Sequence, residues 1–248
     1  MKYFELKCIA YIKKEIPLND SFDALSSYIN YCFTKNEVLR KLHEEKDFKN
    51  YCFGNFYPIE KDKVYKTGNT YEFVIRSLDE EFIYKLQKLL RENVNNSFFQ
   101  VLQATKKVVK QFFVSELYTI TPTITTVKDE NNKSIFWTVD KDGDILKLQE
   151  QLQKNLLKKY EKFYNEKLEP TQNFIQLLEI KNQKPQSIYF MKKINDNKSI
   201  RVRLLGNKFK IVPNEDEVSQ KLAFVALGCG LGEKQSYGGG FVLGKGMR

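Results

Sequence analysis

The spacing of apolar residues along the chain changes repeatedly between the two-residue period of a strand and the 3.6-residue period of a helix. Residues 2–12 alternate as a strand does, and residues 22–33 then carry an apolar stripe at helical spacing. Because such a chain must pack amphipathic helices onto sheets, this order of elements constrains the fold more than any other sequence feature.

The first half of the chain predicts the order β-α-β-β-α-β. Residues 36–45 suggest a second short helix, Gly68-Asn69 marks a hairpin turn between two strands, and residues 79–94 return to helical spacing. Residues 112–127 are rich in β-branched and aromatic residues and are expected to supply the strands that complete the unit. This is the order of a ferredoxin-like domain.

The second half repeats this order. Residues 134–139 are typical of a strand, and residues 144–167 of a long helix with lysines on its outer side. The further elements are strands at 173–181 and 187–194, a hairpin, a helix at 215–227 and a last strand near 240–243. The sequence therefore predicts an α+β protein of two tandem ferredoxin-like (RRM-like, βαββαβ) domains, at residues 1–122 and 123–248.

Composition favours a cytoplasmic protein with a polyanionic partner. The net charge is +10, and nucleic acid is the commonest partner of a basic cytoplasmic protein. No stretch approaches the ~18 consecutive apolar residues that a membrane span requires. The four cysteines are far apart and form no C-x-x-C pair, so neither a disulfide framework nor a zinc site is indicated. We expect no cofactor and no metal.

Residues 198–212 predict a basic β-hairpin. A two-residue turn at Gly206-Asn207 would bring basic side chains of both strands onto one face and apolar side chains onto the other. The basic face would consist of Arg201, Arg203, Lys208 and Lys210. It contains no acidic residue, which favours contact with phosphate over an ordinary solvated face.

Glycine is concentrated near the end of the sequence, in GCGLGEKQSYGGGFVLGKG. Glycine permits positive φ and a close approach to a ligand, although a structural loop is the simpler interpretation. The dinucleotide pattern G-x-G-x-x-G fails because Glu233 occupies the third glycine position. The residues proposed to contact a ligand here are Gly230, Gly232, Lys234, Gly238, Gly239 and Gly240.

These glycines resemble the C-terminal glycine-rich motif of the RAMP superfamily of CRISPR RNA-binding proteins. Length, basic charge and the tandem ferredoxin order agree with this resemblance, which covers essentially the whole chain. Gly239 departs from the family pattern, which has a bulky residue there. Within the superfamily, the chain is most similar to the stand-alone endoribonucleases that process CRISPR repeat transcripts. The resemblance implies CRISPR repeat RNA and the processed guide RNA as partners, together with membership of a larger interference complex.

The resemblance also implies an active site in the first domain. The family places a catalytic histidine just after the first helix, where His43 is the only histidine of the chain. Tyr28 and Lys49 match the tyrosine and lysine of some members, with Tyr31 and Lys46 as second choices. From pattern alone, His43 would be an exposed residue of a charged helix.

The implied chemistry needs no metal, because RNA supplies its own nucleophile in the ribose 2′-hydroxyl. Attack on the adjacent phosphorus leaves a 2′,3′-cyclic phosphate and a 5′-hydroxyl. Histidine suits the proton transfers because its ordinary pKa of ~6.5 lies near neutrality. The alternative is a non-catalytic RAMP scaffold subunit that only binds guide RNA. A general RRM-type RNA-binding module is disfavoured, because the stacking aromatic residues of its RNP motifs cannot be placed in this sequence.

Overall fold

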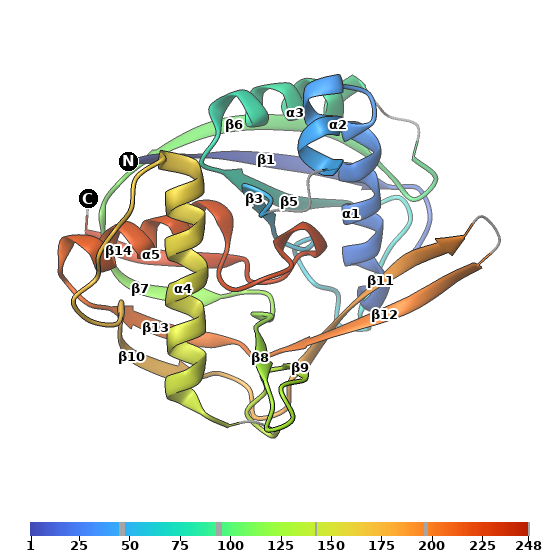
Figure 1. Cartoon of the computed structure of the whole chain (residues 1–248). Coiled ribbons are helices and arrows are strands. Elements are labelled where there is room, and N and C mark those ends of the chain that lie inside the picture. Colours follow the sequence, from blue (N-terminus) through green and yellow to red (C-terminus); the bar gives the residue numbers. More distant parts are fainter. Residues whose placement is uncertain (45–47, 93–95, 142, 196–197, 248) are drawn as a thin grey trace.

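The computed structural model of the chain describes residues 1–44, 48–92, 96–141, 143–195 and 198–247, except for the side chains of residues 42 and 43 (Figure 1). The first half forms a four-stranded sheet in the order β3-β5-β1-β6, with every neighbouring pair antiparallel. Its strands are β1 (Lys2–Ile12), β3 (Tyr51–Phe53), β5 (Thr70–Ser77) and β6 (Phe99–Lys110). Its helices are α1 (Leu18–Phe33), α2 (Glu37–Glu44) and α3 (Glu80–Glu92).

The second half forms a second four-stranded antiparallel sheet, in the order β10-β13-β7-β14. Its strands are β7 (Phe113–Thr119), β10 (Ile175–Ile180), β13 (Phe209–Pro213) and β14 (Val242–Met247). Its helices are α4 (Ile145–Tyr164) and α5 (Glu217–Cys229). None of the helices in the described ranges is long and apolar enough to cross a membrane.

Both sheets have the strand order of a ferredoxin-like domain. In each, the first strand of the unit lies between the third and the fourth, and the second strand lies at the edge beside the third. The predicted α+β fold with two tandem ferredoxin-like units is therefore confirmed.

The strand that completes the first unit differs from the prediction. It is β6, which pairs with β1 over the full length of that strand, while β7 within the predicted segment 112–127 belongs to the second sheet. A register shift between Ile9 and Ala10 interrupts the alternation of β6 and hides its strand pattern. The change of sheet falls between β6 and β7, and the division into 1–122 and 123–248 stays a prediction.

Several short elements decorate the two units. They are the strand pairs β2 (Ile16–Pro17) with β4 (Val64–Tyr65) and β8 (Thr126–Lys128) with β9 (Ser134–Phe136), the long ribbon of β11 (Gln186–Asn195) with β12 (Lys198–Gly206), and a 3₁₀ turn, η1 (Gln235–Tyr237). The ribbon projects from the second half and lies beside α1 of the first (Figure 1).

The predicted hairpin with its turn at Gly206-Asn207 is wrong. Strand β12 pairs with β11, and β13 pairs with β10 and β7. Asn207 is fully buried, where its side chain accepts a hydrogen bond from Val139 N and donates one to the Asn182 carbonyl. Gly206 and Asn207 therefore lie at the buried point where the chain passes from the β11-β12 ribbon to strand β13 of the second sheet.

Arg76 joins the two halves. It is 6% exposed, and its Nη1 donates to the Val242 carbonyl at 2.7 Å while its Nε donates to Glu5 Oε2 at 2.7 Å. Its guanidinium also contacts the rings of Tyr3 and Phe241. Because these contacts come from β1, β14 and the segment before β14, the two sheets are fixed relative to each other at this point.

Candidate nucleic-acid interface

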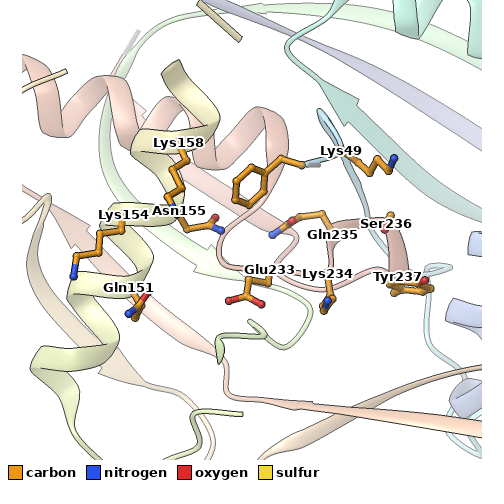
Figure 2. A pocket seen from close by; sticks show the side chains of 11 residues that line it. Lys49, Gln151, Lys154, Asn155, Lys158, Glu233, Lys234, Gln235, Ser236 and Tyr237 are labelled. Carbon is orange, nitrogen blue, oxygen red and sulfur yellow. The ribbon is translucent and has the colours of Figure 1, made fainter. Parts of the chain in front are cut away.

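A cleft of about 600 Å³ opens where the segment after α2, the outer face of α4 and the glycine-rich end of the chain meet (Figure 2). Its lining residues are Phe48, Lys49, Gln151, Lys154, Asn155, Lys158, Glu233, Lys234, Gln235, Ser236 and Tyr237. We refer to this set as the cleft. It combines residues from both halves of the chain, so it depends on the tandem arrangement of the two units.

Helix α4 contributes a polar stripe to the cleft. Asp144 caps the helix by accepting a hydrogen bond from Lys147 N at 3.0 Å. Leu148, Leu152 and Leu156 are fully buried against the second sheet and α5. The polar side chains follow at helical spacing on the neighbouring face, namely Gln151, Lys154, Asn155 and Lys158.

The glycine-rich loop (residues 230–241) forms the opposite wall. Gly240 has φ +65°, and a Cβ there would lie 1.8 Å from the Leu231 carbonyl oxygen, so only glycine fits. Gly238 has φ +90° and packs against the ring of Phe22. All the glycines predicted to contact RNA are buried. They shape the loop, and its solvent-facing residues are Lys234, Ser236 and Tyr237.

Two side-chain donors bind the carbonyl groups of the loop from inside the protein. Lys159 Nζ donates to the carbonyls of Gly230 at 2.8 Å and Gly232 at 2.9 Å. Gln235 Nε2 donates to the carbonyls of Leu231 at 3.2 Å and Gly232 at 2.5 Å. These hydrogen bonds fix the conformation of the loop at residues 230–232.

The cleft carries excess positive charge. Lys158 and Lys234 are exposed and form no ion pair within the part of the chain that the structure describes. The carboxylate of Glu233 accepts hydrogen bonds from the backbone N and the Oγ1 of Thr126. The buried Oδ1 of Asn155 has no hydrogen-bond partner among the described residues. The free ammonium groups suit a phosphate-bearing ligand, whereas the unpaired Oδ1 is an acceptor and gives no support for phosphate.

The structure places one of the predicted catalytic residues, Lys49, at the cleft. His43 lies on α2, close before Lys49 in the sequence. The side chain of His43 lies outside the described part of the structure, as does the whole of Lys46. Their roles stay predictions.

Tyr28 and Tyr31 lie at a different pocket, beside Asn96 and Phe98. Tyr28 is 3% exposed, and its hydroxyl donates to the Leu90 carbonyl at 3.0 Å. Burial raises the pKa of Tyr28, with a smaller contribution from the neighbouring Cys32. Tyr31 is 39% exposed, and its ring lies beside the ammonium of Lys35.

The predicted basic face does not form as one surface. Arg201 and Arg203 lie on the ribbon, where Arg201 pairs with Asp20 at 2.7 Å and Arg203 Nε donates to Ser187 Oγ at 2.7 Å. Lys210 lies on β13 and pairs with Glu116 at 2.7 Å. The prediction failed because it paired β12 with β13, whereas these strands belong to different sheets.

Lys208, which precedes β13, is half-buried, and burial lowers its pKa. The contact of the four basic residues with RNA stays a prediction, but it would involve separate surfaces.

The ribbon also approaches the glycine-rich loop. The rings of Phe190 and Tyr237 stack with their centroids 4.0 Å apart. Met191 N donates to Asp23 Oδ1 at 2.9 Å, which attaches the ribbon to α1. The ribbon, α1 and the loop thus form a continuous surface beside the cleft.

Sequence reasoning missed the contribution of α4. The residues Gln151, Asn155 and Lys158 recur at intervals of three and four, which was a sufficient signal for one helical face. Within the described ranges, no group of three or more His, Cys, Asp and Glu side chains could hold a metal ion.

Known proteins show the same architecture. The chain is 26% identical over 242 residues to "CRISPR-associated endoribonuclease Cas6 2" of Methanocaldococcus jannaschii, covering 90% of this chain and 93% of that protein. A solved structure described as "CRISPR associated protein Cas6" is 26% identical, with a TM-score of 0.70 and coverage of 98% and 99%. "An RAMP protein binding different RNA substrates" is 19% identical with a TM-score of 0.65, covering 98% of this chain and 99% of its own, and shares the fold.

The sequence model of one family, "CRISPR associated protein Cas6, C-terminal", matches residues 107–243. These residues include α4, the ribbon and the glycine-rich loop. Because the match covers more than half of the chain, the protein belongs to the Cas6 family.

Proposed function

We propose that this protein is a metal-independent endoribonuclease that cuts CRISPR repeat transcripts into guide RNAs. Its relative in Methanocaldococcus jannaschii is named an endoribonuclease, and family membership supports repeat RNA as the substrate. The observation that carries the proposal is the cleft, which is lined by Lys49, Lys158 and Lys234 from three separate parts of the chain. Three lysine side chains around one opening suit the backbone of a single RNA segment.

The proposed reaction is an internal transesterification. A base removes the proton of the ribose 2′-hydroxyl, and the oxygen attacks the adjacent phosphorus. The bond from phosphorus to the 5′-oxygen breaks, and an acid protonates that oxygen. The products are a 2′,3′-cyclic phosphate and a 5′-hydroxyl, so neither a metal nor a cofactor takes part.

We assign the proton transfer to His43 and the stabilisation of charge on the phosphorane to Lys49. A correctly placed general acid or base typically accelerates a reaction by ~10²–10⁴. A lysine beside the phosphate adds stabilisation that is strongest in the transition state. Tyr28 is the weaker candidate, because its hydroxyl is already bound to the Leu90 carbonyl and would have to leave it.

The RNA path would follow the exposed cations. Lys158 and Lys234 lie in the cleft, and Arg201 and Arg203 on the ribbon would contact RNA beyond it. Charge reversal in the Arg201→Glu, Arg203→Glu double variant should weaken RNA binding by more than about ten-fold at low salt. Unchanged binding would remove the ribbon from the RNA path.

The decisive experiment uses the repeat RNA of the host in excess EDTA. Wild-type protein is compared with His43→Ala, and each is also given a substrate with a 2′-deoxyribose at the cut site. Cleavage by the wild type alone, with loss of cleavage after either change, is the expected result. As a matched control, Lys88→Ala on α3 should cut normally.

Other outcomes would replace parts of the proposal. Tight, salt-sensitive binding without cleavage would favour the alternative, a non-catalytic RAMP scaffold subunit. Cleavage that EDTA abolishes would refute metal independence, and full activity of His43→Ala would refute the proposed site. Retention of the guide RNA, assembly with other interference subunits and a cytoplasmic location remain expectations from the family.

A further inference from the structure

Lys159 lies beneath the cleft and takes no part in the proposed chemistry. It is 2% exposed, although its neighbours Lys158 and Asn155 on α4 line the opening. Its ammonium group donates to the Gly230 and Gly232 carbonyls, at 2.8 and 2.9 Å. Helix α4 therefore lines the cleft with its polar side chains and also binds the glycine-rich loop through the buried Lys159.

A buried ammonium in this environment opposes folding unless it is compensated. No carboxylate lies within ion-pair distance of Lys159 in the described ranges, and its bonding partners are carbonyl dipoles. Burial lowers the pKa of Lys159 to about 8, while the nearby Cys229, Cys52 and Glu233 oppose this shift. An apolar side chain of the same length would avoid this desolvation. The presence of lysine is therefore better explained by the loop than by the core.

The consequence for the loop follows from its hydrogen bonds. With Lys159 and Gln235 as donors, three successive carbonyls from Gly230 to Gly232 are bound. Glu233 N then donates to the Ile124 carbonyl at 2.7 Å, which fixes the point where the chain turns into the cleft. Lys234 follows immediately in a left-handed conformation with φ 62°, so its side-chain direction depends on the preceding turn.

We propose that Lys159 is a positioning residue, which fixes the glycine-rich loop so that Lys234 meets the RNA without Lys159 touching the RNA itself. This inference rests on the proposed function only for the identity of the ligand. The proposal predicts that the effects of Lys159 and Lys234 on RNA affinity are coupled, because Lys159 acts through the conformation of the loop that carries Lys234.

The test is a double-mutant cycle on RNA affinity, with Lys159→Met, Lys234→Met and the combined variant. Lys159→Met should raise the Kd for repeat RNA by about ten-fold, within the range of residues coupled through a backbone shift. Lys234→Met should weaken binding clearly in the wild-type background but by less than about two-fold when Lys159 is already Met. Lys159→Arg, which keeps charge and donors, should restore most of the affinity.

A matched control distinguishes the effect of the position of Lys159 from the effect of losing one positive charge. Lys88 lies on α3, and its side chain is 70% exposed. Lys88→Met removes one positive charge there and should leave the Kd for repeat RNA within about two-fold of the wild-type value. If Lys159→Met does not fold, Lys159→Gln replaces it in the cycle, because its amide is polar but too short to reach both carbonyls. Circular dichroism establishes folding before affinity is compared.

A second measurement needs no RNA. The loop amides of Glu233, Gly239 and Gly240 donate to the carbonyls of Ile124, Lys234 and Pro122, respectively. Their hydrogen exchange should be faster in Lys159→Met than in Lys88→Met. Equal exchange in the two variants would overturn the inference, as would additive effects in the cycle. If the wild type neither binds nor cuts RNA, the proposed function fails, and hydrogen exchange alone then decides whether Lys159 organises the loop.

Discussion

The buried Lys159 leads to a prediction about stability that is independent of RNA. The wild type should gain stability relative to Lys159→Met as the pH rises above neutrality. In the folded protein the pKa of Lys159 is about 8, compared with the ordinary value of 10.5 in an unfolded chain. Between these two values the unfolded chain binds more protons than the folded one, so raising the pH favours the folded state.

The magnitude follows from the two pKa values. At 1.36 kcal/mol for each factor of ten in the proton equilibrium, keeping the buried ammonium charged near pH 7 costs about 3 kcal/mol of folding free energy. Near pH 9.5 the folded protein holds Lys159 mostly neutral, and the cost falls to about 1 kcal/mol. The difference in unfolding free energy between wild type and Lys159→Met should therefore shift by about 2 kcal/mol in favour of the wild type.

The assay is urea unfolding of both proteins at the two pH values. Four buried cysteines have raised pKa values, because burial disfavours their thiolates, and they destabilise the fold at alkaline pH. The contribution of Cys8 and Cys32 is shared by both proteins, and the interaction of Cys52 and Cys229 with Lys159 is part of the difference that the comparison measures. A difference that stays constant with pH, or that moves toward the variant, would refute the reasoning about the buried charge.

Three substitutions test the framework around the cleft by chemical unfolding. Gly240→Ala should cost at least about 2 kcal/mol, because it strains a positive φ and drives a Cβ against the Leu231 carbonyl; a cost below about 0.5 kcal/mol would contradict the described loop. Arg76→Met should cost about 3 kcal/mol, since it removes the donor to Val242 and leaves a mostly buried carboxylate unpaired; wild-type stability would show that the junction contributes little. Leu156→Ala should cost about 3 kcal/mol by leaving a cavity under the cleft, and a much smaller value would mean that α4 repacks.

Local patterns predicted most of the fold. The alternation of residues 2–12 and the helical stripe that follows correspond to β1 and α1, and the long helix at 144–167 corresponds to α4. These elements were predictable because each buries one face in a single core. The apolar residues of that face therefore recur in the sequence at the period of a strand or a helix. Strand β6 was missed, because its register shifts opposite Ile9 and Ala10.

The basic hairpin failed for a nonlocal reason. Gly-Asn is a strong turn signal when two strands flank it, but Asn207 satisfies its side chain with partners far away in the sequence. Strand β12 pairs instead with β11, and Ile188 of β11 packs with Leu204 of β12 in a small apolar cluster.

Lys49 and the glycine-rich loop, which the sequence had suggested, line the cleft together with α4, which it had not suggested, and their roles stay predictions. The lysines of α4 were expected on its outer side, but Lys159 follows Leu152 and Leu156 at the spacing of the buried face and is 2% exposed. A lysine at a position of the apolar stripe was the sequence signal that could have indicated a buried ammonium group. Its partners could not be predicted, because they are carbonyl groups of a loop more than seventy residues away.

The contacts of Arg76 with both halves of the chain affect how the protein folds during its synthesis. The carbonyl that receives its hydrogen bond belongs to Val242, 166 positions later in the chain. On the ribosome, the first sheet would be synthesised long before β14 exists, and during that interval the guanidinium has Glu5 but no acceptor from the second half. The first domain should therefore emerge as an incomplete intermediate, with its face toward the second half open to a chaperone until the last strand arrives.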